Sequence, residues 1–147
     1  MILVDTNILL RMAQPSHSMH SAVVSAVSLL TERGETPCVV PQVLYEYWAA
    51  GTRPAQVNGL ALSAAEVDTD IAKILQRFRL LPDDPAIFDI WLRLAALHQV
   101  LGKNAYDARL VAAMDFHGIA AILTFNVGDF ARFAGVTVID SASIAAA

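Results

Sequence analysis

The sequence has a single cysteine and no long apolar run, although the chain as a whole is unusually apolar. With Cys38 alone, no disulfide can form within the chain, which fits a reducing cytoplasm. Hydrophobic residues make up 56 % of the sequence and the mean hydropathy is +0.50, yet no stretch approaches the roughly eighteen apolar residues of a membrane-spanning helix. Asp5 interrupts the first apolar stretch and no basic segment precedes it, so we expect no signal peptide and no membrane association.

Basic residues are scarce and form no run. Ten Lys and Arg residues against fourteen Asp and Glu residues give a net charge of −4. This balance excludes a protein that coats nucleic acid through bulk charge. An enzyme that cleaves RNA remains compatible with it, because a metal-binding acidic cluster itself lowers the net charge. Any phosphate contact must then be local.

Repeats, low-complexity segments and linkers rich in Gly, Pro or Ser are also missing, which predicts one domain over residues 1–147. Short β-branched and aliphatic runs alternate with amphipathic segments along the chain. We expect strands near 2–4, 37–40, 79–82, 119–125 and 136–139, and helices near 6–13, 17–33, 41–51, 63–78, 85–102, 104–118 and 127–133. This alternation predicts the α/β class, with a parallel sheet covered by helices on both faces.

Acidic residues recur where this sheet would place a ligand. Asp5 ends the first predicted strand, and Asp129 follows the fourth, in "LTFNVGDF". Helices leave a parallel sheet at the carboxyl ends of its strands, so these two acids should share one edge. Glu46 lies on the helix after the second strand, and Asp107 lies in the first turn of the helix that leads into the fourth strand. The alternation alone does not bring these two to that edge.

Each acid also has an ordinary structural explanation. Asp5 is suited to cap the helix that follows it. Asn104 and Asp107 have the spacing of a reciprocal helix cap, and acids in a first helical turn favour the helix dipole. Glu46 could be a solvated helix position, and Asp129 a turn residue after Gly128. Local sequence leaves these alternatives open.

The ordered set of motifs resembles a known family. "LVDTNILL", "VPQVLYEYW", "NAYDARLVAAM" and "LTFNVGDFARF" are similar, in order, spacing and context, to the motifs of PIN-domain ribonucleases of the VapC toxin type. The resemblance weakens only over residues 52–79. It implies a three-layer α/β/α fold with a central, mostly parallel sheet of four to five strands. It also implies a metal-dependent endoribonuclease, the toxin of a toxin–antitoxin pair, with RNA as substrate and an antitoxin protein as partner.

The resemblance also implies a set of site residues. Carried over position by position, it predicts Asp5, Glu46, Asp107 and Asp129 as the catalytic and metal-binding acids, with Thr6, Thr124 and Asn126 as polar support. Some family members have an aspartate in place of Asn126, so this chain has fewer charges for a second ion. Basic residues near the acids are candidate phosphate contacts: Arg11, Lys103 and Arg109.

The chemistry of such a cluster is direct. Crowded carboxylates repel one another and take up protons unless a cation compensates them. Hard oxygen ligands with room for water suit Mg²⁺ or Mn²⁺. The ion can lower the pKa of a bound water and neutralise charge that develops on a phosphate.

Other function classes share some of these sequence features. A phosphotransferase of the haloacid-dehalogenase kind also begins with a strand that ends in aspartate, but it needs a second acid two residues on, where this chain has Asn7. A non-catalytic interaction module, or a PIN nuclease of RNA processing outside a toxin–antitoxin pair, are further alternatives. No nucleophile elbow, P-loop or dinucleotide-binding motif is present. The apolar excess, including Trp48, Phe88 and Trp91, predicts a homodimer.

Overall fold

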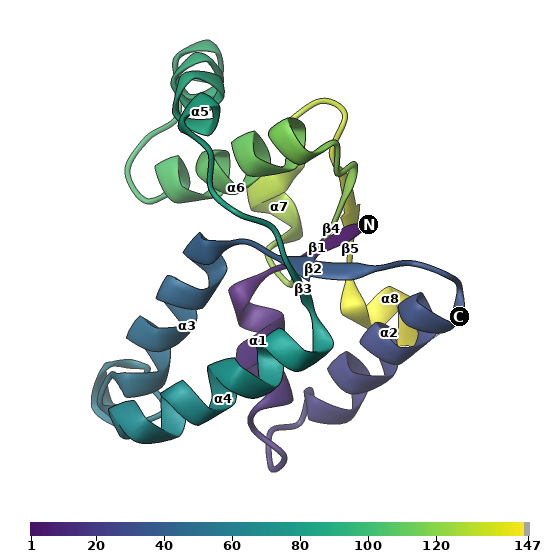
Figure 1. The fold of residues 1–147 in the computed structure, drawn as a ribbon, viewed down its shortest axis with the longest axis vertical. Coiled ribbons are helices and arrows are strands. Elements are labelled where there is room, and N and C mark those ends of the chain that lie inside the picture. The colour runs from purple at the N-terminus through teal and green to yellow at the C-terminus, as the bar shows by residue number, and fades with distance from the viewer. Residues whose placement is uncertain (146–147) are drawn as a thin grey trace.

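A computed structural model describes residues 1–145. Five short strands form one sheet (Figure 1): β1 (Ile2–Val4), β2 (Pro37–Val39), β3 (Arg79–Leu80), β4 (Ala121–Leu123) and β5 (Thr137–Ile139). Their order is β3-β2-β1-β4-β5, and every neighbouring pair is parallel. The predicted α/β class with a central parallel sheet is therefore confirmed.

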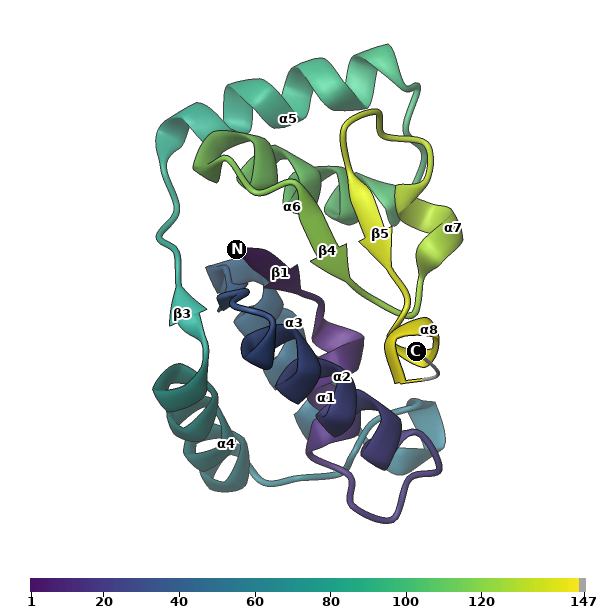
Figure 2. The ribbon, with the colours of Figure 1, turned by 90° about the vertical axis from the view of Figure 1, so that its right-hand side faces the viewer.

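Helices cover the sheet on both sides (Figures 1 and 2). The helices are α1 (Thr6–Met12), α2 (His20–Glu32), α3 (Pro41–Thr52), α4 (Ala64–Arg77), α5 (Pro85–Leu97), α6 (Asn104–His117), α7 (Val127–Phe130) and α8 (Ser141–Ala145), with a 3₁₀ turn at Ala55–Val57. Both views place α5 and α6 on one side of the sheet and α1, α2 and α4 on the other. None of the described helices is long and apolar enough to cross a bilayer.

Many of the apolar side chains are buried between the sheet and the helices of this three-layer arrangement. All three residues of β1 are buried, because helices pack on both faces of the central strand. Cys38 is fully buried as well. Its thiol donates to the carbonyl of Ile2, and burial raises its pKa to about 11. This environment produces an inert structural thiol.

Several predicted helix ends were wrong. The second helix begins at His20 rather than near 17, because residues 13–19 form successive tight turns instead of a capped helix start. The long helix after β3 ends at Leu97 rather than near 102. Gln99 adopts a left-handed backbone conformation, with φ of 49°, which no continuing α-helix contains. The start of α4 matches the prediction, and a capping box of Ser63 and Glu66 is present there.

The predicted cap at Asn104 is absent. Lys103 occupies the N-cap position of α6 without a side-chain bond, and Asn104 is the first helical residue. The N–H groups of residues 104–106 are already satisfied, because they donate to the carbonyls of residues 101–103 in a tight turn. A reciprocal bond between Asn104 and Asp107 therefore does not form. Asp107 still lies in the first turn of α6, where an acid favours the helix dipole.

Gly59 has a tight backbone environment that yields a stability prediction. A Cβ atom at Gly59 would lie 2.1 Å from the carbonyl oxygen of Arg53, within the loop that folds back on the end of α3. A backbone atom cannot move aside as a flexible side chain can. We expect Gly59→Ala to lower the free energy of unfolding by about 1–3 kcal/mol or more.

Gly128 provides the matched control. A Cβ there meets nothing within 4 Å, and Gly128 lies inside α7, so alanine should be neutral or stabilise by about 0.5–1 kcal/mol. Urea denaturation of both variants measures the difference. Equal stability of the two variants would contradict the described loop.

Candidate active site

The candidate site lies at the carboxyl edge of the sheet, where the strand order changes direction. The chain leaves β1 toward β2 on one side, and β4 lies on the other side of β1. Parallel α/β sheets bind ligands at such a point, in the crevice beyond the strand ends. Asp5 follows β1 and Thr124 follows β4, and these two side chains meet there.

Asp5 is buried and held by three donors. One carboxylate oxygen accepts from the backbone N–H of Thr6 at 2.7 Å, so Asp5 is indeed the N-cap of α1. The other oxygen accepts from the Thr124 hydroxyl at 2.7 Å and from the Asn7 amide at 3.4 Å. Capping of α1 therefore uses only one oxygen of this carboxylate, while the other oxygen accepts from Thr124 and Asn7.

Glu46 is held in a similar way from α3. Its Oε2 accepts from the Thr6 hydroxyl and its Oε1 from the Gln42 amide, each at 2.8 Å. The side chain is half-buried, so the alternative of a freely solvated helix position is wrong. Thr6 thus joins two of the acids, because its backbone binds Asp5 and its hydroxyl binds Glu46.

Asp107 and Asp129 complete the group from the other side of the sheet. Asp107 lies in the first turn of α6 and Asp129 in the short helix α7, and both are half-buried. Burial and the charges of Asp129, Asp5 and Glu46 raise the pKa of Asp107 to about 6. This mutual influence shows that the fold brings all four acids into one electrostatic environment.

The pKa of Asp5 is raised as well. Burial is the main cause, and the charges of Glu46 and Asp129 add to it, while the bonds from Thr124 and Thr6 act in the opposite direction. No lysine or arginine forms an ion pair with any of the four acids among the described residues. Lys103 alone lowers the pKa of Asp107, as the smallest contribution. The cluster therefore carries negative charge that its own chain does not neutralise.

Polar support comes partly from residues that the sequence analysis did not select. Thr6 and Thr124 contact the acids as predicted, whereas Asn126 contributes its backbone N–H, which donates to the Thr124 hydroxyl at 3.0 Å. Asn7 and Gln42 were missed. The position of Gln42 one helical turn before Glu46 was a usable signal. Asn7 lies two residues after Asp5 and bonds to it, whereas its second partner, Thr124, is 117 residues away and left no signal in the sequence.

The three candidate phosphate contacts lie in different surroundings. Lys103 is exposed and close enough to influence Asp107. Arg109 donates to Asp83 at 2.9 Å, and its Nη1 atom is buried without a partner. Arg11 lies at the far end of α1 from Asp5 and donates to Gln14 at 2.8 Å. Of the three, only Lys103 influences one of the four acids of the candidate site.

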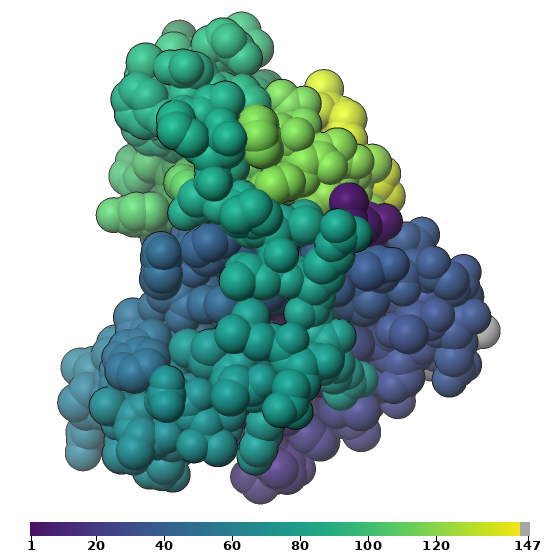
Figure 3. All heavy atoms as spheres, viewed as in Figure 1, coloured from purple at the N-terminus to yellow at the C-terminus, as the bar shows by residue number. Residues whose placement is uncertain are grey.

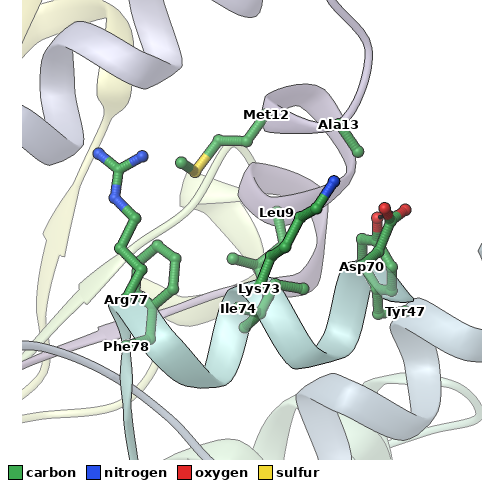
Figure 4. A pocket seen from close by; sticks show the side chains of 9 residues that line it. All are labelled: Leu9, Met12, Ala13, Tyr47, Asp70, Lys73, Ile74, Arg77 and Phe78. Atoms are coloured by element: carbon green, nitrogen blue, oxygen red, sulfur yellow. Dashed lines mark hydrogen bonds between the residues drawn. The ribbon is translucent and has the colours of Figure 1, made fainter. Parts of the chain in front are cut away.

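A separate cavity of about 340 Å³ lies among α1, α3 and α4 (Figure 4). Leu9, Met12 and Ile74 contribute apolar surface to it, and Lys73 and Arg77 contribute positive charge. At one end, the Tyr47 hydroxyl donates to Asp70 at 2.8 Å and ties α3 to α4. None of the four acids lines this cavity, so we assign it no catalytic role.

The described residues contain no ready-made metal cage, since no three His, Cys, Asp or Glu side chains are arranged to hold an ion. The donor chemistry nevertheless suits one kind of ion. Mg²⁺ keeps several waters and commonly binds through one or two carboxylates together with substrate phosphates. A cluster of carboxylates without basic partners suits an ion that keeps waters and also binds the substrate phosphate. It suits less well an ion that is surrounded entirely by protein ligands.

Several solved structures have the same fold. VapBC2 from Rickettsia felis, bound to a promoter DNA fragment, matches with a TM-score of 0.73 at 14 % identity, over 95 % of this chain and 98 % of that one. FitAcB from Neisseria gonorrhoeae matches with a TM-score of 0.69 at 21 % identity, over 96 % of this chain and 98 % of that one. VapC20 from Mycobacterium tuberculosis, a toxin that cleaves the sarcin–ricin loop, matches with a TM-score of 0.67 at 17 % identity. The match covers 92 % of this chain and 98 % of that one.

Sequence comparison identifies the family. Ribonuclease VapC24 from Mycobacterium tuberculosis is 28 % identical over 139 residues, which cover 90 % of this chain and 91 % of that protein. The family model for the PIN domain matches residues 2–136. That match includes all four acids and confirms the resemblance that the motifs indicated: this chain belongs to the PIN domain family.

Proposed function

We propose that this protein is a metal-dependent endoribonuclease, the toxin of a toxin–antitoxin pair, with its nuclease unit spanning residues 1–147. The observation that carries the proposal is the coupling of Asp5, Glu46, Asp107 and Asp129 in one site without a basic counterion. Membership of the PIN family and the likeness to a ribonuclease support the reaction class. No competing nucleophile motif is present in the sequence.

The four acids are the proposed ligands of Mg²⁺ or Mn²⁺. When bound, such an ion lowers the pKa of a water and neutralises charge that develops on the scissile phosphate. The chain itself keeps its carboxylates oriented. Thr124 and Asn7 direct Asp5, while Thr6 and Gln42 direct Glu46, so neutral donors hold the acids without cancelling their charge.

Charged side chains near the site are the proposed phosphate contacts. Lys103, whose charge reaches Asp107, is the best placed of them. Arg109 and Arg11 contact Asp83 and Gln14 in this structure and would have to exchange those bonds for a phosphate. An acidic protein with so few basic residues holds RNA by local contacts rather than by a broad positive surface.

An antitoxin protein is the proposed partner. A toxin–antitoxin complex from Klebsiella pneumoniae supports this, because a protein in it has the same fold, with a TM-score of 0.65. RNA and an antitoxin as partners imply that this chain acts in the cytoplasm.

Catalysis gives the first test of this proposal. Purified protein should cleave looped or single-stranded RNA in the presence of Mg²⁺ or Mn²⁺, and EDTA should stop the reaction. Asp5→Asn should reduce cleavage by about 10²-fold or more, because Asp5 is the most buried of the proposed ligands. Gel electrophoresis of end-labelled RNA measures both effects. Cleavage that persists in EDTA and survives Asp5→Asn would rule out the proposed chemistry.

Asp107→Asn separates a metal ligand from a purely structural helix residue. In the metal-free protein, the pKa of Asp107 is about 6, above its unfolded value of 3.8. The folded state therefore binds more protons than the unfolded state between these values, and this group lowers stability as pH rises from about 4 to 6. Asparagine does not titrate, so the variant should melt at an equal or higher temperature at pH 7, while metal affinity and cleavage fall together.

Asp115→Asn is the matched control, because Asp115 is an exposed acid on the same helix. It should change neither cleavage nor Mn²⁺ binding by calorimetry. An Asp107→Asn protein that is less stable than the parent but cleaves normally would leave only three acids in the proposed site.

We also propose a homodimer. Large apolar side chains on α3, on α5 and in the segment after α5 are exposed in one chain: Trp48, Leu92, Leu97 and Leu101. Association of two copies would remove them from water. Trp91 is not available for this contact in full, because it is half-buried and its indole N–H donates to the carbonyl of Ala105 at 2.8 Å.

Light scattering at micromolar concentration should therefore give the mass of two chains. Leu92→Glu should shift the protein toward the monomer, because it places a charge among these side chains, whereas Leu75→Glu on α4 should not. A monomeric mass for the unaltered protein would overturn the dimer.

A further inference from the structure

Two of the four acids belong to helices on different sides of the molecule. Figure 3 shows α5 and α6 as a lobe that stands clear of the α3 and α4 side. Glu46 lies on α3, and Asp107 lies in the first turn of α6. Burial is the main cause of the raised pKa of Asp107, and the charge of Glu46 contributes to it. The two carboxylates therefore interact, and their relative position depends on how α3 and α6 are held together.

Gln42 joins these two helices. It lies in the first turn of α3, one helical turn before Glu46, and is only 9 % exposed. Its amide nitrogen donates to Oε1 of Glu46 at 2.8 Å and to the backbone carbonyl of Tyr106 at 2.9 Å. Among the described residues, the bond to Tyr106 is the only hydrogen bond between α3 and α6. Because Tyr106 directly precedes Asp107, one nitrogen connects the two acid-bearing segments.

The neighbours of Gln42 fix the orientation of its amide. A carboxylate oxygen and a backbone carbonyl are both acceptors, so only the amide nitrogen can face them. The amide oxygen of Gln42 is buried and has no hydrogen-bond partner among the described residues. A buried acceptor without a partner is unfavourable, and an apolar side chain of the same length would avoid this cost. Packing alone therefore does not account for a glutamine at this position.

The partners of Gln42 do not depend on it for their own hydrogen bonds. The carbonyl of Tyr106 lies inside α6, where it also accepts from the N–H of Leu110, four residues on. Glu46 is half-buried, so its carboxylate has access to water. What the two bonds provide is a fixed position of Glu46 relative to the first turn of α6.

We propose that Gln42 is a positioning residue of the metal site: it fixes Glu46 relative to Asp107, so that both carboxylates contribute to binding a divalent cation. This role rests on the proposed metal-dependent function and adds the contact that aligns the acids of α3 and α6. A neutral amide makes this contact without cancelling the charge that attracts the cation. Hydrogen-bond partners of metal-binding carboxylates typically change metal affinity by roughly 10–100-fold when they are replaced.

Gln42→Met tests this role, because methionine has a similar length but no amide. Calorimetric titration of the metal-free protein with Mn²⁺ should show an affinity about tenfold weaker, or more. The melting temperature without metal should change by no more than about 3 °C, because removal of the unpartnered oxygen offsets the loss of two hydrogen bonds. Gln76→Met, at an exposed position of α4, is the matched control and should change neither quantity.

Hydrogen exchange measured by mass spectrometry examines the contact between the helices directly. In metal-free Gln42→Met, the amides of residues 104–107 should exchange faster, because the first turn of α6 is no longer bonded to α3, while those of the last turn should not change. Gln42→Asn keeps the amide but is shorter by one methylene, so it cannot reach both acceptors. It should resemble Gln42→Met, and normal Mn²⁺ affinity in Gln42→Asn would overturn the proposed role.

The same variants separate this role from the general function. Saturating Mn²⁺ should restore RNA cleavage by Gln42→Met, because the defect lies in metal affinity. Unchanged Mn²⁺ affinity, or a clearly lower melting temperature of the metal-free variant, would refute the positioning role and leave the four acids as proposed ligands. If the unaltered protein neither bound Mn²⁺ nor cleaved RNA, the proposed function itself would fall.

Discussion

Repulsion among four carboxylates at one edge of the sheet is the constraint on which this site depends. The charges of Asp5, Glu46 and Asp129 act together with burial to raise the pKa of Asp107 to about 6. A protein could relieve such repulsion with a nearby lysine or arginine, but no ion pair of that kind is present among the described residues. The fold instead holds the acids with neutral donors, which orient each carboxylate and leave its charge available for a cation.

The parallel sheet makes this arrangement sterically possible. Its central strand β1 is paired on both sides and covered by helices, so Asp5 emerges from the buried centre of the molecule. Thr6 then links Asp5 to Glu46, and Thr124 links the end of β4 to Asp5. Three segments far apart in the sequence are thereby held to one another by short side-chain bonds, and such bonds preorganise the side chains of a functional site.

The first turn of α6 has two roles in this view. The backbone carbonyls of residues 105 and 106 accept hydrogen bonds from Trp91 and Gln42. The side chain of Tyr106 lines a pocket between α5 and α6, and Asp107 is one of the four acids. Because this turn also satisfies its own N–H groups with the carbonyls of residues 101–103, it needs no side-chain cap. The Asp107 side chain is consequently not engaged in a reciprocal cap with Asn104.

The sequence by itself determined the layered α/β fold, the family and the edge at which Asp5 and Asp129 lie. These follow from local patterns: apolar runs that end in polar residues, helix start signals and the order of four motifs. The sequence did not determine where α2 begins or where α5 ends. The turns at residues 13–19 and the left-handed conformation of Gln99 depend on how neighbouring elements pack. Only the tertiary structure decided which side chains support the acids. Asn7 and Thr124 are 117 residues apart, so their contact exists only once β1 and β4 are adjacent in the sheet. The pocket between α5 and α6 also depends on the tertiary structure, because hydrophobic periodicity predicts the two helices but not which of their faces pack together.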